Sequence, residues 1–178
     1  GDEDYIHHTT DKLAEWLAAQ GDFAGAEKVL RDETAARPGD PRLWAALAGI
    51  VGRGRGTLAA AEVISNGQLA AGESVDLRLA RARVWADDFQ PGRERRLAQL
   101  EDLAPTASDA DRARLLAGLA EIYETVRDDA GRTRVLAQVA GRDGRDVASR
   151  KALFALSLRG DDASARARWR ESVQRAEG

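Results

Sequence analysis

Apolar residues recur every three or four positions along almost the whole chain, and no stretch alternates between apolar and polar residues as a strand would. Helix caps and breakers divide this pattern into short segments. Asp22, Asp40, Ser74 and Asp146 stand at predicted helix starts, and Gly21 at a predicted end. The sequence therefore predicts an all-α protein. Its ten expected helices cover about 11–20 (after Thr9-Thr10), 23–37, 41–52, 57–71, 75–87, 91–104, 109–126, 130–140, 146–160 and 162 onward.

A repeat lies beneath this helical pattern. In the first helix of each predicted pair, a small residue recurs at separations of 34, 34, 38 and 35 positions, and a large apolar residue follows it three positions later. In an Ala-rich chain, one such set of equivalent positions (a column) could match by chance. Several columns that match in the same register are much less expected by chance. The small column is Ala14, Ala48, Ala82, Ala120 and Ala155, the large one is Leu17, Val51, Trp85, Tyr123 and Leu158, and a third holds Leu13, Leu47, Leu119 and Phe154, with Arg81 as the exception.

The repeat has a physical explanation. Two helices approach closely only where one side chain is small, and large neighbours then fill the adjacent grooves. One helix pair cannot bury its apolar face alone, so stability accumulates where successive pairs stack. The period predicts an N-terminal tail at 1–6 and one helical-repeat domain at 7–178, with repeats at about 7–40, 41–74, 75–107, 108–144 and 145–178.

This pattern resembles the tetratricopeptide-repeat (TPR) family, most closely in the first repeat. Gly21-Asp22-Phe23 matches the family's turn, which usually reads Gly-Asp-Tyr. Later repeats depart from the pattern, because Glu94, Arg132 and Arg166 replace the family's second-helix alanine. The resemblance implies a right-handed α-α superhelix, or solenoid, of about five antiparallel helix hairpins. The family positions matched are Ala14, Leu17, Ala26, Leu30 and Pro38 in the first repeat, and Trp44, Leu47, Ala48, Ala60 and Ile64 in the second.

The resemblance also implies a non-catalytic scaffold that binds a peptide or protein partner along the concave face of the first helices. Arginine suits such a surface because its planar fork binds carboxylates bidentately. The alternative is that these positions are ordinary solvated faces of amphipathic helices. The candidate partner-binding residues are Arg42, Arg53, Arg83, Arg114, Glu121 and Arg159.

The composition argues against several other classes of function, among them thiol chemistry, nucleic-acid binding and catalysis. The absence of cysteine excludes disulfides and thiol nucleophiles but fits either a cytosolic or an exported protein. The net charge of −3 argues against a nucleic-acid-binding repeat module, which stays the alternative function because only a continuous basic face would support it. An enzyme would need convergent titratable groups, and no catalytic motif is present. The predominance of Arg over Lys is as typical of a GC-rich, bacterial genome as of phosphate binding.

Further expectations concern the chain's ends and partners. No stretch reaches the length of about 20 apolar residues that spans a bilayer. No methionine occurs, even at position 1, so we expect a fragment of a larger protein. Exposed end repeats leave self-association open.

Two local motifs contain residue types that can bind ligands. Gly52-Arg53-Gly54-Arg55-Gly56 lacks Walker spacing and a preceding strand, so a flexible hairpin turn is favoured over anion or RNA contact. The adjacent His7 and His8 do not converge on one metal ion. We therefore expect neither a metal site nor a cofactor. The four tryptophans read as packing anchors, unless one is left exposed as a partner contact.

The register of the small column can be tested directly. Ala48→Leu should overpack the helix crossing and lower the free energy of unfolding by about 1–3 kcal/mol, measured by chemical denaturation. An unchanged unfolding midpoint would show that the register is wrong.

Overall fold

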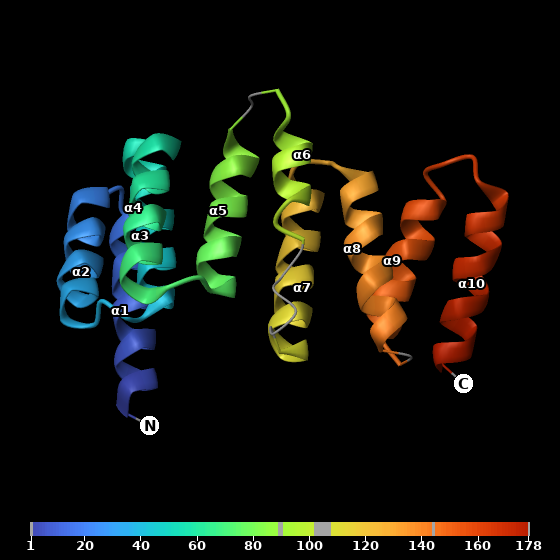
Figure 1. The fold of residues 1–178 in the computed structure, drawn as a ribbon, viewed down its shortest axis with the longest axis horizontal. Coiled ribbons are helices and arrows are strands. Elements are labelled where there is room, and N and C mark those ends of the chain that lie inside the picture. Colours follow the sequence, from blue (N-terminus) through green and yellow to red (C-terminus); the bar gives the residue numbers. More distant parts are fainter. Residues whose placement is uncertain (1, 89–90, 102–107, 144, 178) are drawn as a thin grey trace. The chain divides into compact units, whose positions relative to one another are not determined.

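The computed structural model describes residues 2–88, 91–101, 108–143 and 145–177, and of residues 2–9 only the helical backbone. The described chain is all-helical, with neighbouring helices packed in pairs (Figure 1). It divides into two compact units, Gly1–Pro91 (unit 1) and Gly92–Gly178 (unit 2). Unit 1 holds α1 (Asp2–Ala19), α2 (Phe23–Ala36), α3 (Pro41–Arg55), α4 (Thr57–Ala71) and α5 (Val75–Asp87), and unit 2 holds α6 (Arg93–Ala98), α7 (Asp109–Thr125), α8 (Asp129–Arg142), α9 (Val147–Ser157) and α10 (Ala163–Glu177).

The predicted caps form as hydrogen bonds. The carboxylate of Asp22 accepts from the backbone N–H of Gly25 at 2.8 Å, and the hydroxyl of Ser74 accepts from Leu77 at 3.2 Å. Asp40 caps α3 in the same way, and Pro41 occupies its first turn. Each cap satisfies a backbone donor that the helix itself cannot. The cap positions read from the sequence are confirmed.

Two predicted helix boundaries are wrong. α1 begins at Asp2 and not after Thr9-Thr10, so helix also covers the segment predicted as a tail. No glycine or proline interrupts residues 2–10, and acidic residues favour the first turn of a helix. α6 is shorter than predicted, and Pro105 lies outside the described residues.

The glycine-rich segment is also not the predicted hairpin turn. Gly52 to Arg55 form the last turn of α3, and only Gly56, at φ +90°, leaves the helix. A Cβ on Gly54 would lie 2.9 Å from Cβ of Phe23, so this position admits little more than hydrogen. The glycine serves close packing between α2 and α3 and not a flexible loop.

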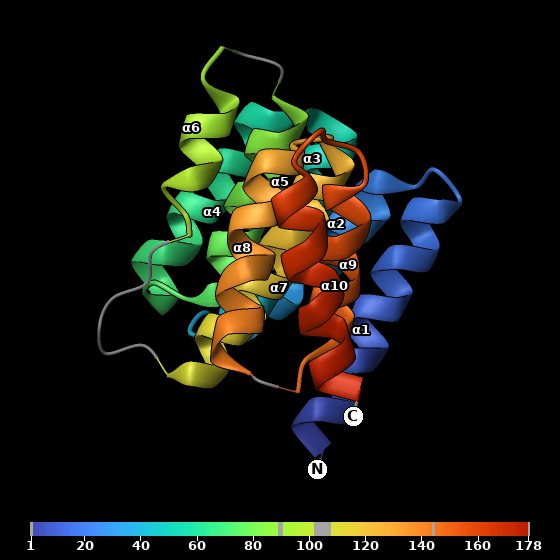
Figure 2. The same cartoon turned by 90° about the vertical axis from the view of Figure 1, so that its right-hand side faces the viewer.

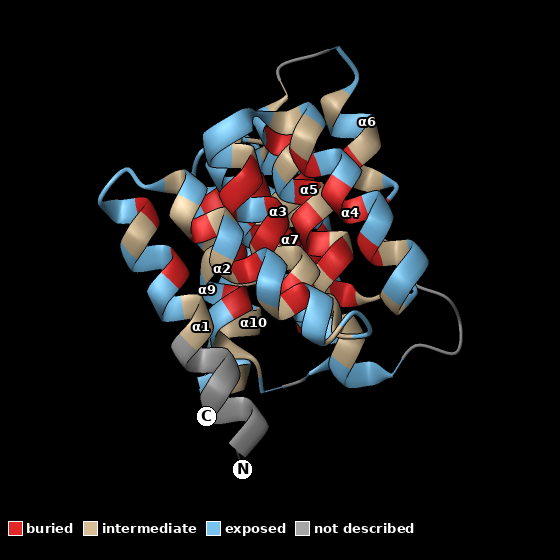
Figure 3. Ribbon diagram, turned by 90° about the vertical axis from the view of Figure 1, so that its left-hand side faces the viewer, coloured by how far each residue is buried: buried red, intermediate tan, exposed pale blue. Residues whose placement is uncertain are grey.

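The core of unit 1 follows the predicted columns. Ala14, Ala48 and Ala82 are at most 1% exposed, and Leu47 and Val51 are buried beside them. α3 packs against α1, α2, α4 and α5. Figure 3 shows the buried positions on the helix faces that meet. Leu13, assigned to the same columns, is 45% exposed because no described element covers that face of α1.

In unit 2, α7, α8, α9 and α10 pack in chain order (Figure 2). The fully buried Tyr123 of α7 donates a hydrogen bond to Glu101 at 2.6 Å. Burial raises the pKa of the Tyr123 phenol, and the bond to Glu101 raises it further. A Cβ on Gly131 of α8 would lie inside van der Waals contact of the Tyr123 ring. A glycine at position 131 therefore lets α7 and α8 approach.

The last repeat departs from the predicted columns. Ala155 and Leu158 are exposed, whereas Leu153 and Leu156 carry the buried face of α9. α10 has no buried residue among those described. The columns fail here because, among the described helices, the α9–α10 hairpin packs mainly against α8, so only one of its sides is covered by a neighbouring repeat.

A buried cation holds the end of unit 2 together. Arg150 is 8% exposed, and its guanidinium donates to the carbonyls of Ala140, Asp143 and Asp146 at 2.6, 2.8 and 2.7 Å. Its Nε donates to Ser172 of α10 at 3.0 Å. These four bonds offset the cost of burying the charge and join α8, α9 and α10.

Two glycines of α8 give opposite predictions. Gly131→Ala should lower the free energy of unfolding by about 1–3 kcal/mol, because its methyl group collides with a buried ring. Gly141→Ala meets no atom within 4 Å and should raise stability by up to about 1 kcal/mol through helix propensity. Thermal and urea unfolding measure both. Equal effects of the two substitutions would contradict this packing of α7 on α8.

Candidate functional site

Two of the predicted binding residues meet in one groove of unit 1. Arg53 of α3 and Arg83 of α5 line it together with Glu15 of α1 and Asp87 of α5. Each of α1, α3 and α5 begins a predicted repeat, so the groove lies on the helices that the sequence assigned to binding. We call it the α1/α3/α5 groove. It has a volume of about 500 Å³, and its remaining lining residues are Ala45, Ala46, Ala48, Gly49, Gly52, Ala80 and Val84.

Small side chains create the space in this groove. α3 contributes only alanine and glycine to its floor besides Arg53. Gly49 is exposed, and a Cβ built on it meets no atom within 4 Å. A peptide backbone could therefore approach α3 closely, with its side chains directed toward the charged rim.

The charges of the groove are only partly neutralised within it. Nη2 of Arg53 lies 2.8 Å from Oε1 of Glu15, which joins α1 to α3. Arg83 and Asp87, one turn apart on α5, form no hydrogen bond or ion pair with any residue that the structure describes. Both are exposed, so the rim offers one cation and one anion to a ligand.

The other predicted binding residues lie elsewhere. Arg42 pairs with Asp40, the cap of its own helix, at 3.2 Å. Arg114 lies 3.8 Å from Asp111. Glu121 is exposed on α7 and lines none of the pockets described here. These three residues are not brought into the groove.

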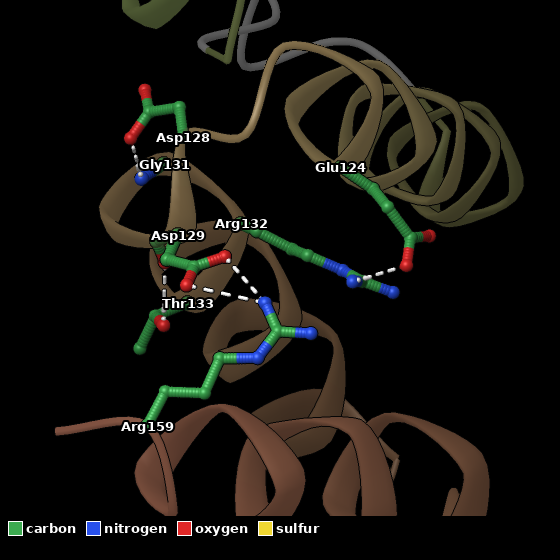
Figure 4. Close-up of polar contacts among 7 residues, drawn as sticks. All are labelled: Glu124, Asp128, Asp129, Gly131, Arg132, Thr133 and Arg159. Atoms are coloured by element: carbon green, nitrogen blue, oxygen red, sulfur yellow. Dashed lines mark hydrogen bonds and ion pairs between the residues drawn. The ribbon is translucent and has the colours of Figure 1, made fainter.

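Arg159 instead joins a second, polar pocket that the sequence did not reveal. The polar pocket of unit 2 has a volume of about 400 Å³ and is lined by Glu124, Arg127, Asp129, Arg132 and Arg159. Arg132 lies 2.5 Å from Glu124, and Nη1 of Arg159 contacts both oxygens of Asp129, at 3.1 and 3.2 Å (Figure 4). Since the Arg159–Asp129 pair is about half exposed, it contributes at most about 1 kcal/mol to stability.

The sequence carries a signal for this pocket at one position, Arg132. Arg132 replaces the small residue of the repeat pattern, and such a change alone indicates a degenerate repeat and not a pocket. Arg127 has φ +60°, a conformation that a side chain disfavours, and no local motif in the sequence predicts it. Sequence reasoning did not bring these residues together because they come from α7, the turn before α8, α8 itself and the turn after α9.

The tryptophans differ in how far they are exposed. Trp44 is partly buried and donates to the carbonyl of Pro38 at 2.7 Å, as a packing anchor should. Trp16 of α1 is 60% exposed, so it remains a candidate partner contact, as expected for a tryptophan left on the surface.

The side chains of His7 and His8 lie outside the described residues. Over the described part of the chain, no group of three or more His, Cys, Asp or Glu could hold a metal ion.

The described helices also include none with the length and apolar character needed to cross a membrane.

Comparison with known proteins agrees with the repeat pattern. The family model described as tetratricopeptide repeat matches residues 8–50. A solved structure titled "MamA RS-1 ArsTM double mutant" superposes with a TM-score of 0.56 over 99% of this chain and 96% of that chain, at 14% sequence identity. That identity is low, so the likeness concerns the fold, which is a TPR-like solenoid. No curated protein matches the chain.

The backbone of Arg127 gives a testable result. Arg127→Gly should raise the free energy of unfolding by about 1 kcal/mol, because glycine adopts a positive φ without steric cost. Arg127→Gln removes the same charge but keeps the side chain, and should not stabilise. Denaturant titration of both variants checks this, and a destabilised Arg127→Gly would contradict it.

Proposed function

Because the chain is a TPR-like repeat protein, we propose that it is a non-catalytic scaffold that binds a peptide or protein partner in the α1/α3/α5 groove. The observation that carries this proposal is a groove with a floor of small residues, mainly alanine and glycine, and a rim on which Arg83 and Asp87 form no ion pair with the described residues. Among the residues predicted from sequence, Arg53 and Arg83 serve this site, and Glu15 and Asp87 join them.

The dimensions of the groove suit a chain segment. A volume of about 500 Å³ falls within the range of about 300–1,000 Å³ typical of ligand pockets. The groove is open, and its lining residues come from the equivalent helices of three successive repeats, α1, α3 and α5. An extended or helical segment can therefore lie across α1, α3 and α5 and bury small side chains on the floor.

The rim charges indicate what the partner carries. Arg83 favours a carboxylate, which its planar guanidinium can bind bidentately. Asp87 favours a cationic side chain about one helical turn away. Arg53 is already paired with Glu15, so it orients the rim and contributes less to charge recognition. The partner segment therefore combines an acidic and a basic side chain over a small apolar centre.

The mixed rim also separates this function from nucleic-acid binding. Glu15 and Asp87 place negative charge in the groove that would repel a phosphate backbone. A protein segment of mixed charge meets no such repulsion.

A charge swap tests the proposal. The variant Arg83→Glu/Asp87→Arg keeps the net charge and alters two exposed residues without described partners. Affinity capture from lysate of the native source, followed by mass spectrometry, should recover with the wild-type chain a protein that the swapped chain loses. The loss is expected because each reversed charge of the rim then faces a like charge of the same ligand.

A matched swap on α2 is the control. Lys28 and Asp32 form an exposed i,i+4 pair at 3.2 Å, so Lys28→Glu/Asp32→Lys reverses two charges one turn apart outside the groove. This variant should retain the partner. Retention by the groove swap, or loss by both swaps, would contradict groove binding, and nuclease-sensitive recovery would favour a nucleic-acid ligand.

A further inference from the structure

The polar pocket of unit 2 replaces an apolar packing site of unit 1. Asp22 and Asp128 cap α2 and α8 in the same way: each carboxylate accepts a hydrogen bond from the N–H three residues later, at 2.8 Å in each case. Residues at equal distances from these caps are therefore equivalent. At four of these positions unit 1 has small or apolar residues and unit 2 has charged ones. The pairs are Ala18 and Glu124, Gly21 and Arg127, Phe23 and Asp129, and Ala26 and Arg132.

Packing alone does not favour these charges. Ala26 is fully buried, whereas Arg132 places a long cationic side chain at the equivalent position. Gly21 has φ +83°, a conformation suited to glycine, and Arg127 occupies the same left-handed region with a full side chain. A backbone outlier that also lines a pocket points to a functional constraint. Glycine and alanine would serve the fold better at positions 127 and 132.

The charges of the pocket are unequal. Glu124 neutralises Arg132, and Asp129 neutralises Arg159 (Figure 4). The exposed guanidinium of Arg127 forms no hydrogen bond or ion pair with the residues that the structure describes. Nε of Arg132 is buried, and it too lacks a hydrogen-bond acceptor within the described chain. The pocket thus has an excess of one positive charge and unsatisfied N–H donors.

We infer that the polar pocket of unit 2 binds a carboxylate on an acidic segment of a partner protein. Guanidinium groups bind carboxylates through paired, charge-assisted hydrogen bonds. One excess positive charge matches a singly charged carboxylate better than a doubly charged phosphate. Glu124 and Asp129 would also repel the repeated charges of a nucleic-acid backbone. The ligand carboxylate competes with Glu124 and Asp129 for their arginine partners, and it forms an additional ion pair with Arg127.

This site is separate in its residues from the α1/α3/α5 groove. The inference uses unit 2 alone, so it does not rest on the function proposed for the groove. Failure of either binding experiment leaves the other unaffected.

The test uses a defined probe and the full chain. A fluorescein-labelled peptide with three consecutive glutamates between Gly-Ser segments is titrated by fluorescence anisotropy, beside its glutamine counterpart. The wild-type chain should bind the acidic peptide and not the glutamine peptide. Arg127→Gln and Arg127→Gly should each weaken binding by about tenfold or more, because both remove the guanidinium without an internal partner.

Arg175→Gln is the matched control, since it removes one exposed arginine charge of α10 outside the pocket. Its affinity should stay within about twofold of the wild type, as expected for a charge outside the site. Arg127→Gly also removes the positive-φ side chain, so lost binding in a variant of unchanged or higher melting temperature supports a direct role.

Three results would overturn the inference. No binding of the acidic peptide would exclude the site, and equal weakening by Arg175→Gln would show diffuse charge attraction. Displacement of the peptide by equimolar inorganic phosphate would identify a small-anion site and not a site for an acidic protein segment.

Discussion

The structure depends on a steric limit: two helices can approach closely only where one of them presents almost no side chain. Ala14, Ala48 and Ala82 meet this limit in unit 1, and Gly131 meets it beside the Tyr123 ring in unit 2. Large neighbours then fill the space around each close contact. Because one helix pair buries only part of its apolar surface, each crossing also supports the next pair along the chain.

The same limit connects the fold to binding. In the α1/α3/α5 groove, the small residues that allow close packing continue onto the open face of α3, where they leave room for a ligand. Charges then remain only at the rim, on Arg53, Arg83 and their acidic neighbours. In unit 2 the equivalent of a packing position has become charged, as Arg132 in place of Ala26 shows. The charged residue at this position lines the polar pocket.

The sequence predicted correctly those features, such as helix caps, that depend only on interactions between residues close together in the chain. Asp22 and Ser74 start helices because a side-chain acceptor satisfies a backbone donor within a few residues, whatever lies further away. The segment Gly52–Gly56 was predicted as a turn because glycine permits one. Residues 52–55 are helical instead, and Gly54 allows close packing against Phe23 of another helix. Arg53 and Arg83 could be placed in a groove by register. The polar pocket could not, since its residues come from α7, α8 and the turns that follow α7 and α9, and the positive φ of Arg127 has no local signature.

A partner that binds in the α1/α3/α5 groove has to lie over the small residues of α3. The chain has no cysteine, so Gly49→Cys provides a unique attachment point on the groove floor, where there is space for a side chain. The same preparation is tested for partner binding before and after labelling with a bulky maleimide, beside Ser65→Cys on the exposed face of α4. We expect the adduct at position 49 to abolish binding and the adduct at position 65 to leave it unchanged. Full binding with position 49 blocked would contradict binding in this groove.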